Sequence, residues 1–193
     1  MKKKVMFLFP PGKVYVRPDG TPAARKHCSP PIGIAYIASN LLKETSIKCA
    51  AQSISKHQNG AFTGDISAEM IKHTGCTHTL VGHSERRQYH QESNDDCREQ
   101  SNIALKNDLI PIYCIGETLL DRENENTFSV IEAQLQEGLQ NIPFNANSII
   151  IAYEPVWAIG TGKVATPEQA QSVHAFIRQT LTRLSSKETA QNI

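Results

Sequence analysis

From about residue 46 onward, short apolar runs alternate with segments in which apolar residues recur at helical spacing. The apolar runs occupy residues 47–53, 77–81, 109–115 and 148–153. Short runs with little polar alternation are typical of parallel strands that are covered on both faces. A strand-then-helix repeat of this kind predicts right-handed βαβ units, and therefore an α/β protein built on a parallel sheet or barrel.

Two helices are predicted between and after these strands. One apolar stripe is formed by Val130, Ile131, Leu135 and Leu139, and a second by Val173, Phe176, Ile177, Leu181 and Leu184. Both follow the period of an amphipathic helix. The second helix also has a predicted start, with Thr166 as N-cap, Pro167 as its first residue and Gln169 as the partner in a capping box.

The first 45 residues differ from the rest of the chain. The segment KVMFLF is a predicted strand, residues 10–31 form a long polar loop rich in Pro, Gly and basic residues, and residues 32–42 form a predicted helix. This makes one β-loop-α unit whose loop is far longer than the others. The sequence therefore predicts two parts, residues 1–45 and 46–193, with about five β-α units in total.

The composition excludes several classes of partner. A net charge of +1 over 193 residues gives no attraction to nucleic acid or to an acidic membrane surface. The apolar run 5–9 ends at Pro10-Pro11, too early for a signal peptide or a membrane span. The five cysteines are odd in number and lack CxxC spacing, which indicates reduced thiols and a cytoplasmic location.

Two chemically suggestive motifs follow predicted strands directly. GHSERR, residues 82–87, follows the run at 77–81, and YEPVWAIGTGK, residues 153–163, ends the run at 148–153. Reacting groups gather at the C-terminal ends of parallel strands, so we expect Glu154 and His83 to project from neighbouring strand tips into one pocket. Glu154 could remove a proton next to a carbonyl, and His83 could donate a hydrogen bond to the oxygen that becomes negative. A helix beginning at Ser84 would keep His83 neutral.

The residues after Glu154 have the pattern of a closing loop. Pro155 makes the start stiff, and Gly160-Thr161-Gly162 makes the middle flexible. Such a loop can close over a ligand and exclude water. The backbone N–H groups around Gly160 could hold an anionic group.

Two other functional interpretations of the residues are weaker. The stretch ending in Gly162-Lys163 is not a nucleotide-triphosphate loop, because Trp157 occupies the position of the required glycine and Val164 that of the Ser or Thr. His73, Cys76 and His78 straddle a predicted helix end and strand start without a second ligand pair. No metal site is therefore predicted.

Four motifs together resemble the triosephosphate isomerase family, in that family's order and spacing. They are GAFTGDIS (residues 60–67), GHSERR, CIGE (residues 114–117) and YEPVWAIGTGK. The resemblance runs from about Ile47 to the end of the sequence, roughly three quarters of its residues. It implies a partial (β/α)8 barrel and interconversion of dihydroxyacetone phosphate and D-glyceraldehyde 3-phosphate through an enediolate, without cofactor or metal.

The resemblance also implies roles for individual residues. Glu154 is expected to be the base and His83 the electrophile, supported by Ser84 and Glu85, with Cys114 buried behind the base. Gly160 is expected to meet the substrate phosphate with its N–H. The remaining lid residues are Pro155, Val156, Trp157, Ala158, Ile159, Thr161, Gly162 and Lys163. Thr63 resembles the tip of a loop that inserts into a partner subunit, which implies a homodimer.

Some parts of the family pattern are not found in this sequence. The family has an N-terminal Asn-x-Lys strand motif whose lysine binds substrate, and C-terminal strands ending in Gly-Gly-Ser and Gly-Gly that grip the phosphate. Neither is present in these 193 residues. We therefore expect impaired turnover. The alternative is a catalytically inactive barrel fragment that acts only as an oligomerising or structural module.

The segment 1–45 resembles a different family, the cobalamin-binding domain that precedes some radical-SAM enzymes. The sequence contains neither Asp-x-His-x-x-Gly for cobalamin nor Cys-x3-Cys-x2-Cys for an iron–sulfur cluster. This resemblance therefore implies a composite chain with a foreign front unit, and no cobalamin binding is expected.

Overall fold

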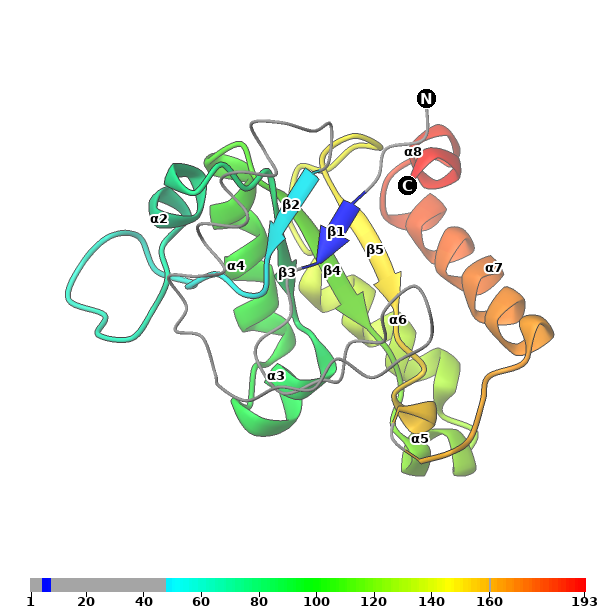
Figure 1. The fold of residues 1–193 in the computed structure, drawn as a ribbon. Coiled ribbons are helices and arrows are strands. Elements are labelled where there is room, and N and C mark those ends of the chain that lie inside the picture. Colours follow the sequence, from blue (N-terminus) through cyan, green and yellow to red (C-terminus); the bar gives the residue numbers. More distant parts are fainter. Residues whose placement is uncertain (1–4, 8–47, 160) are drawn as a thin grey trace, which may run out of the picture.

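The fold is known from a computed structural model that describes residues 5–7, 48–159 and 161–193. Five strands form one parallel sheet in the sequential order β1-β2-β3-β4-β5 (Figure 1). Their bounds are β1 Val5–Phe7, β2 Lys48–Ala51, β3 His78–Val81, β4 Ile110–Ile115 and β5 Ile150–Tyr153. Parallel strands in sequential order, separated by helices, are the arrangement of a (β/α) barrel wall. The predicted α/β fold with parallel strands is thus confirmed.

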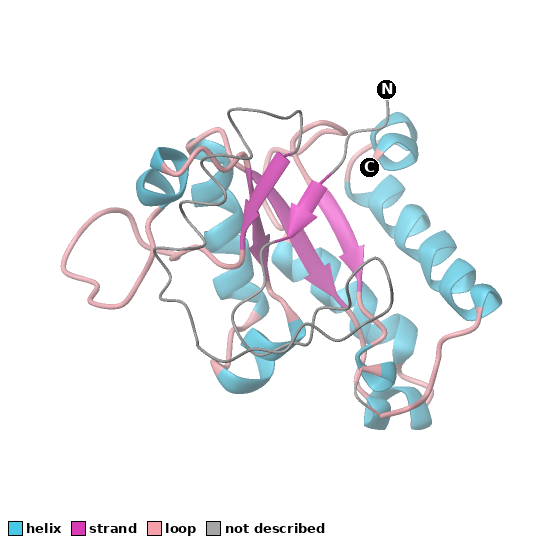
Figure 2. Ribbon diagram, in the orientation of Figure 1, coloured by secondary structure: helices cyan, strands magenta, loops and turns pink. Residues whose placement is uncertain are grey.

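Helices connect the strands from β2 to β5 and cover one side of the sheet (Figure 2). The segment α4 packs on β3 and β4, and α6 packs on β4, on α4 and on α7. The described helices are α2 Ala68–His73, α3 Ser84–Tyr89, α4 Asn94–Lys106, α5 Leu119–Glu123, α6 Thr127–Gly138, the short 3-10 helix η1 Val156–Ala158, α7 Pro167–Leu184 and α8 Lys187–Asn192. None of the helices in the described part of the chain is both long and apolar enough to cross a membrane.

The strands divide their side chains between two apolar layers. The larger layer lies between sheet and helices and contains Val81, Tyr113 and Ile115 together with residues of α4, α6 and α7. The smaller layer lies on the opposite face and is formed by Ala50, Leu80, Ile112, Cys114 and the partly buried Ala152. Alternate residues of a strand point to opposite faces. A residue at the end of a strand therefore faces the small layer if it lies two positions from a residue that already does.

Local capping explains where several helices begin. At α7 the Thr166 hydroxyl accepts from the Gln169 N–H while the Gln169 side chain accepts from the Thr166 N–H, and Pro167 is the first helical residue. The capping box predicted for this helix is confirmed. Ser93 with Asp96 and Thr118 with Asp121 form the same motif at α4 and α5. Each box satisfies backbone N–H groups that have no partner within the helix.

The two predicted amphipathic helices and the four predicted strands after residue 46 are all present, with slightly shorter bounds. Strand β1 falls inside the segment KVMFLF and pairs in parallel with β2. The helix expected at residues 32–42 and the long loop before it lie outside the described residues. The division of the chain near residue 46 therefore stays a prediction.

Candidate active site

Glu154 is the first residue after β5, and its backbone continues the β4–β5 ladder. Its N–H donates to the carbonyl oxygen of Ile115 at 2.8 Å. Ala152 belongs to the small apolar layer. Since residues two apart in a strand share a face, this register directs the Glu154 side chain toward the same side of the sheet.

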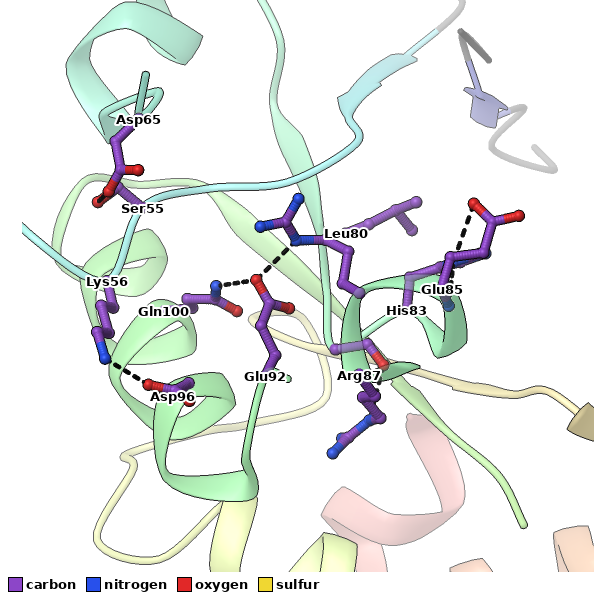
Figure 3. A network of polar contacts seen from close by, with 12 residues as sticks. Ser55, Lys56, Asp65, Leu80, His83, Glu85, Arg87, Glu92, Asp96 and Gln100 are labelled. Atoms are coloured by element: carbon purple, nitrogen blue, oxygen red, sulfur yellow. Dashed lines mark hydrogen bonds and ion pairs between the residues drawn. The ribbon is translucent and has the colours of Figure 1, made fainter. Parts of the chain in front are cut away.

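His83 lies two residues after β3, as the N-cap of α3. Its Nδ1 accepts a hydrogen bond from the backbone N–H of Glu85 at 3.3 Å. The Glu85 carboxylate lies beside the same ring nitrogen at 4.0 Å (Figure 3). Because Nδ1 is an acceptor, the proton of the neutral imidazole is assigned to Nε2. The expected helix start at Ser84 is confirmed.

The carboxylate of Glu154 and the imidazole of His83 are in direct contact. Nε2 of His83 lies 3.1 Å from Oε1 of Glu154. The second carboxylate oxygen accepts from the N–H of Ser84 at 3.1 Å. The side chains of His83 and Glu154 are 24% and 21% exposed, so solvent still reaches both. An acid and a hydrogen-bond donor therefore meet at the C-terminal ends of the strands.

The expectation that these residues come from neighbouring strands is wrong. Strand β4 lies between β3 and β5 in the sheet. Adjacent strands are about 4.8 Å apart, so β3 and β5 are separated by roughly twice that distance. Two features bridge the gap. His83 lies beyond the end of β3, and both side chains are long enough to meet above the end of β4.

Cys114 lies at the end of β4, below the meeting point of Glu154 and His83. It is paired in register with Ala152, two residues before Glu154, and its side chain is buried. Burial raises the pKa of the Cys114 thiol, and the nearby Glu154 carboxylate raises it further. The thiol therefore stays protonated and unreactive beside the base.

Gly116 gives the Glu154 backbone room to approach β4. A Cβ atom at Gly116 would lie only 1.8 Å from the carbonyl oxygen of Glu154. Gly116 is held in turn by the side-chain amide of Gln134 on α6. The Gly116 N–H donates to Oε1 of Gln134 at 2.8 Å, and Nε2 of Gln134 donates to the Gly116 carbonyl oxygen at 3.1 Å.

Arg87 holds the loop that carries His83. Its Nε donates to the carbonyl oxygen of Gly82 at 2.8 Å, and its Nη2 donates to that of Cys114 at 3.3 Å. Nη1 donates to Asn94 at 2.7 Å. Arg86 forms an ion pair with Glu92 at 2.6 Å, and Gln100 donates to the same Glu92 oxygen (Figure 3). The two arginines of GHSERR thus make fold-supporting contacts.

The segment after Glu154 begins as an ordered turn. Residues Val156–Ala158 form η1, and Trp157 at its centre is buried. The Thr161 hydroxyl donates to the Trp157 carbonyl oxygen at 2.9 Å. Gly160 lies outside the described residues, so its expected contact with a phosphate stays a prediction.

A buried carboxylate supports this turn from below. Glu117 is fully buried, accepts from the Tyr153 hydroxyl at 3.0 and 3.1 Å, and pairs with Nη1 of Arg122 at 3.0 Å. The Arg122 guanidinium carbon lies 4.4 Å from the centre of the Trp157 ring. The Arg122 cation thus lies between the buried Glu117 carboxylate and the Trp157 indole, and it holds the start of the segment after Glu154 in place.

Sequence reasoning placed Glu154, His83, Ser84, Glu85 and Cys114 together, and the structure does so too. It assigned no role to four supporting residues: Gly116, Glu117, Arg122 and Gln134. Gly116 and Glu117 belong to CIGE and directly follow a strand, and this position is the sequence feature from which a role in the site could have been predicted. Gln134 and Arg122 lie on helices, and nothing in their local sequence indicates these contacts.

Thr63 is exposed in the loop between β2 and α2, and its expected contact with a partner subunit stays a prediction. Within the described residues, no three or more His, Cys, Asp or Glu side chains gather in a way that could hold a metal ion.

The fold and this pair of side chains define a class: an α/β protein in which a carboxylate and an imidazole are in hydrogen-bond contact at the C-terminal ends of parallel strands. A sequence model of the family described as triosephosphate isomerase matches residues 19–193. The chain therefore belongs to the triosephosphate isomerase family. The match starts upstream of residue 46 and so reaches into the front segment. The comparisons lend no support to the resemblance of that segment to a cobalamin-binding domain.

Individual relatives are similar over most of this chain. A triosephosphate isomerase of Endomicrobium trichonymphae is 47% identical over 165 residues, which are 85% of this chain and 66% of the relative. One from Leptospira borgpetersenii is 48% identical over 80% of this chain and 63% of its own length. One from Geotalea uraniireducens is 43% identical, over 86% and 66%. The chain thus spans slightly less than two thirds of the length of these relatives.

Proposed function

We propose that this chain interconverts dihydroxyacetone phosphate and D-glyceraldehyde 3-phosphate through an enediolate. The observation that carries the proposal is the 3.1 Å contact between Nε2 of His83 and Oε1 of Glu154. Such a reaction needs a base for a carbon-bound proton and a donor for the adjacent oxygen, within the reach of one small substrate. Family membership and the relatives named triosephosphate isomerase support the same reaction.

In this proposal Glu154 removes the proton from the carbon next to the carbonyl group. His83 donates its Nε2–H to the oxygen on which negative charge develops. The Glu85 N–H donates a hydrogen bond to Nδ1, so Nδ1 acts as an acceptor and the ring proton stays on Nε2. His83 then gives its Nε2 proton to that oxygen and takes the proton of the neighbouring hydroxyl, and Glu154 returns its proton to the adjacent carbon, so the isomerisation balances without a metal or cofactor.

Substrate binding must separate the two side chains. At 3.1 Å they are in hydrogen-bond contact, and no substrate atom fits between them. The Glu154 carboxylate must therefore leave both His83 and the Ser84 N–H when substrate enters. Gly160 and the lid residues listed for 155–163 are proposed to close over the substrate at that step and exclude water.

A coupled isomerase assay on purified, monodisperse protein tests the proposal. Glu154→Gln should lower kcat by at least about a thousandfold, since an amide cannot act as the base. Glu132→Gln, at a partly exposed ion pair with Arg183 between α6 and α7, is the matched control and should leave the rate unchanged. Turnover that survives Glu154→Gln would contradict the proposal.

We further propose that turnover is lower than in the related triosephosphate isomerases. The family binds substrate with the lysine of an Asn-x-Lys motif, and no Asn-x-Lys occurs in this sequence. Well-folded protein without any turnover would instead favour the alternative, an inactive module that only oligomerises. Circular dichroism and a thermal melt on the assayed sample separate that outcome from misfolding.

We also propose a homodimer formed through the loop at residues 57–64. Figure 1 shows this loop reaching out from the body of the molecule. Its base is closed by the Ser55 N–H donating to the Ile66 carbonyl oxygen at 2.9 Å and by the Ser55 hydroxyl donating to Asp65 at 2.6 Å. Phe62 on this loop, and Ile66 and Met70 shortly after it in the chain, expose apolar surface. Exposed apolar residues on a protruding loop are typical of a contact surface.

Light scattering after size-exclusion chromatography tests the dimer. Thr63→Arg adds charge and bulk at the expected contact and should shift the mass from dimer to monomer. Thr182→Arg, on an exposed part of α7, is the control and should keep the dimer. A monomer in the unmodified chain, at concentrations up to about 100 μM, would contradict the proposal.

The cytoplasm is the proposed location. Cys49, Cys76, Cys97 and Cys114 are all free thiols. Free thiols in this number are usual in proteins of a reducing compartment.

A further inference from the structure

Tyr113 of β4 ends in a polar junction inside the helix-facing layer. Its side chain is fully buried. Its hydroxyl donates to the carbonyl oxygen of Gln134 on α6 at 2.6 Å and accepts from Nη2 of Arg87 at 3.3 Å. A buried hydroxyl with both a donor and an acceptor partner has its hydrogen-bonding needs met and fixes the groups around it.

The Arg87 side of this junction leads to His83. Arg87 binds the carbonyl oxygen of Gly82, the residue directly before His83, and that of Cys114 at the end of β4. The position of its guanidinium group thus sets where the His83 loop lies relative to β4. The Tyr113 side chain belongs to the helix-facing layer, on the opposite face of the sheet from the small layer of Cys114 and Ala152.

The Gln134 side of the junction leads to Glu154. The Tyr113 hydroxyl holds the backbone of Gln134, and the side chain of the same residue holds both the N–H and the carbonyl oxygen of Gly116. Gly116 in turn abuts the Glu154 carbonyl oxygen, where no Cβ atom would fit. A shift of α6 along this path would move the backbone that carries Glu154.

The neighbouring helix leaves room for the Tyr113 hydroxyl at one position. A Cβ atom at Gly138 would lie 2.0 Å from the Tyr113 oxygen. Any larger residue there would displace the ring or the helix. The space at Gly138 and the two hydrogen bonds together form a site built for this hydroxyl.

We propose that Tyr113 is a positioning residue, whose hydroxyl joins the Arg87 and Gln134 contacts into one network that fixes Glu154 relative to His83. The consequence for turnover rests on the proposed isomerase function. The consequence for the geometry of the two side chains does not.

Tyr113→Phe removes the hydroxyl and keeps the ring. In the isomerase assay, well below the melting temperature, kcat should fall about tenfold with KM unchanged, because a misplaced base loses rate without losing substrate contacts. In nitrogen-15 NMR spectra of the full chain, the His83 Nε2–H signal should shift, since its hydrogen bond to Glu154 changes. The peak missing in His83→Gln assigns that signal.

Thr180→Val is the matched control. Thr180 is a fully buried residue on α7 whose hydroxyl accepts from Arg183 at 2.9 Å, and among the described residues no hydrogen bond of this hydroxyl reaches the network. Its replacement should lower the melting temperature while leaving kcat and the His83 signal unchanged. Gln134→Leu, which breaks the second half of the network, should reproduce the effects of Tyr113→Phe.

The NMR measurement separates this proposal from the proposed function. A shifted His83 signal in both network variants supports the positioning role even if the unmodified chain shows no turnover. A His83 signal that stays at its unmodified position in Tyr113→Phe and Gln134→Leu, in folded protein, overturns it whatever the assay shows.

Discussion

The Cα atom of Gly116 packs directly under the carbonyl oxygen of Glu154, so that a Cβ atom at this position would come within 1.8 Å of it. The contact joins the end of β4 to the end of β5. Its tightness means that the base is placed by backbone packing as well as by its own hydrogen bonds. A glycine here is required for space, and the conformational freedom of glycine plays no part.

Gly116→Ala should therefore move Glu154 away from His83. The expected result is a loss in kcat of about a hundredfold, because a displacement of about 1 Å at a reacting group has an effect of that size. KM should change little. Steady-state kinetics on the purified variant, with circular dichroism to verify its fold, is the measurement.

The matched comparison for this variant is Ala152→Gly, one strand position before the ladder ends. It removes a methyl group from the small apolar layer without adding a contact to Glu154. A loss of at most a few fold is expected. If Gly116→Ala kept full kcat, the tight contact would have no influence on the base.

Arg122 should matter for stability far more than a surface arginine. It pairs with the fully buried Glu117 and lies over the Trp157 ring. Arg122→Met leaves that carboxylate buried without a cation, which costs about 3 kcal/mol in the free energy of unfolding. Urea unfolding followed by circular dichroism measures it.

Arg98 provides the control for this change. It pairs with Asp95 at 2.6 Å, and the Asp95 side chain is 71% exposed. Arg98→Met should cost less than about 1 kcal/mol, as is usual for exposed ion pairs. Equal losses of unfolding free energy in Arg122→Met and Arg98→Met would show that the burial of Glu117 does not increase the contribution of its ion pair to stability.

Much of the fold follows from local sequence. The strand at 110–115 is a continuous apolar run because its alternate residues, such as Ile112 and Tyr113, face two different buried layers. The start of α7 follows from Thr166, Pro167 and Gln169, whose side chains cap the helix without help from elsewhere. The polar helix α4 was not singled out, because charged residues dominate its surface and obscure its buried positions.

The arrangement of the site could be predicted from the sequence only in part. His83 and Glu154 could be predicted because each follows a strand closely inside a recognisable motif. That they meet across β4, instead of between adjacent strands, depends on the length of the turn after β3. The contacts of Gln134 with Gly116 join residues 18 positions apart. Such contacts depend on how α6 packs on the sheet, which a pattern of residues along one segment does not encode.

The free thiols should differ sharply in reactivity. Cys97 and Cys114 are buried, and burial raises the pKa of Cys97 to about 11. At pH 8 only about one Cys97 in a thousand is then a thiolate.

Cys76 is only partly buried. Iodoacetamide labelling of native protein, with peptide mass spectrometry, should modify Cys76 well before Cys97 and Cys114. Labelling in about 6 M urea should remove the difference, whereas early modification of Cys114 in native protein would contradict the buried position behind the base.

Asp96 should make folding sensitive to acid. Its carboxylate accepts from Lys56 at 2.5 Å and from the Ser93 N–H and hydroxyl, and the Lys56 hydrogen bond is the main reason that its pKa falls to about 2 (Figure 3). The folded-state pKa lies below the ordinary value of 3.8, so this stabilisation is fully present above about pH 4 and is lost as the pH falls toward 2.

Asp96→Asn should remove that pH-dependent part of the stability. The difference in unfolding free energy between the unmodified chain and Asp96→Asn should be constant from pH 7 to about pH 5 and then shrink steadily toward pH 2. Urea midpoints at each pH measure it. Asp95→Asn removes a neighbouring exposed carboxylate but keeps the capping box, and its difference from the unmodified chain should stay small throughout. A difference for Asp96→Asn that grows on acidification would mean that the carboxylate destabilises the folded state, because only a folded pKa above the unfolded one gives that sign.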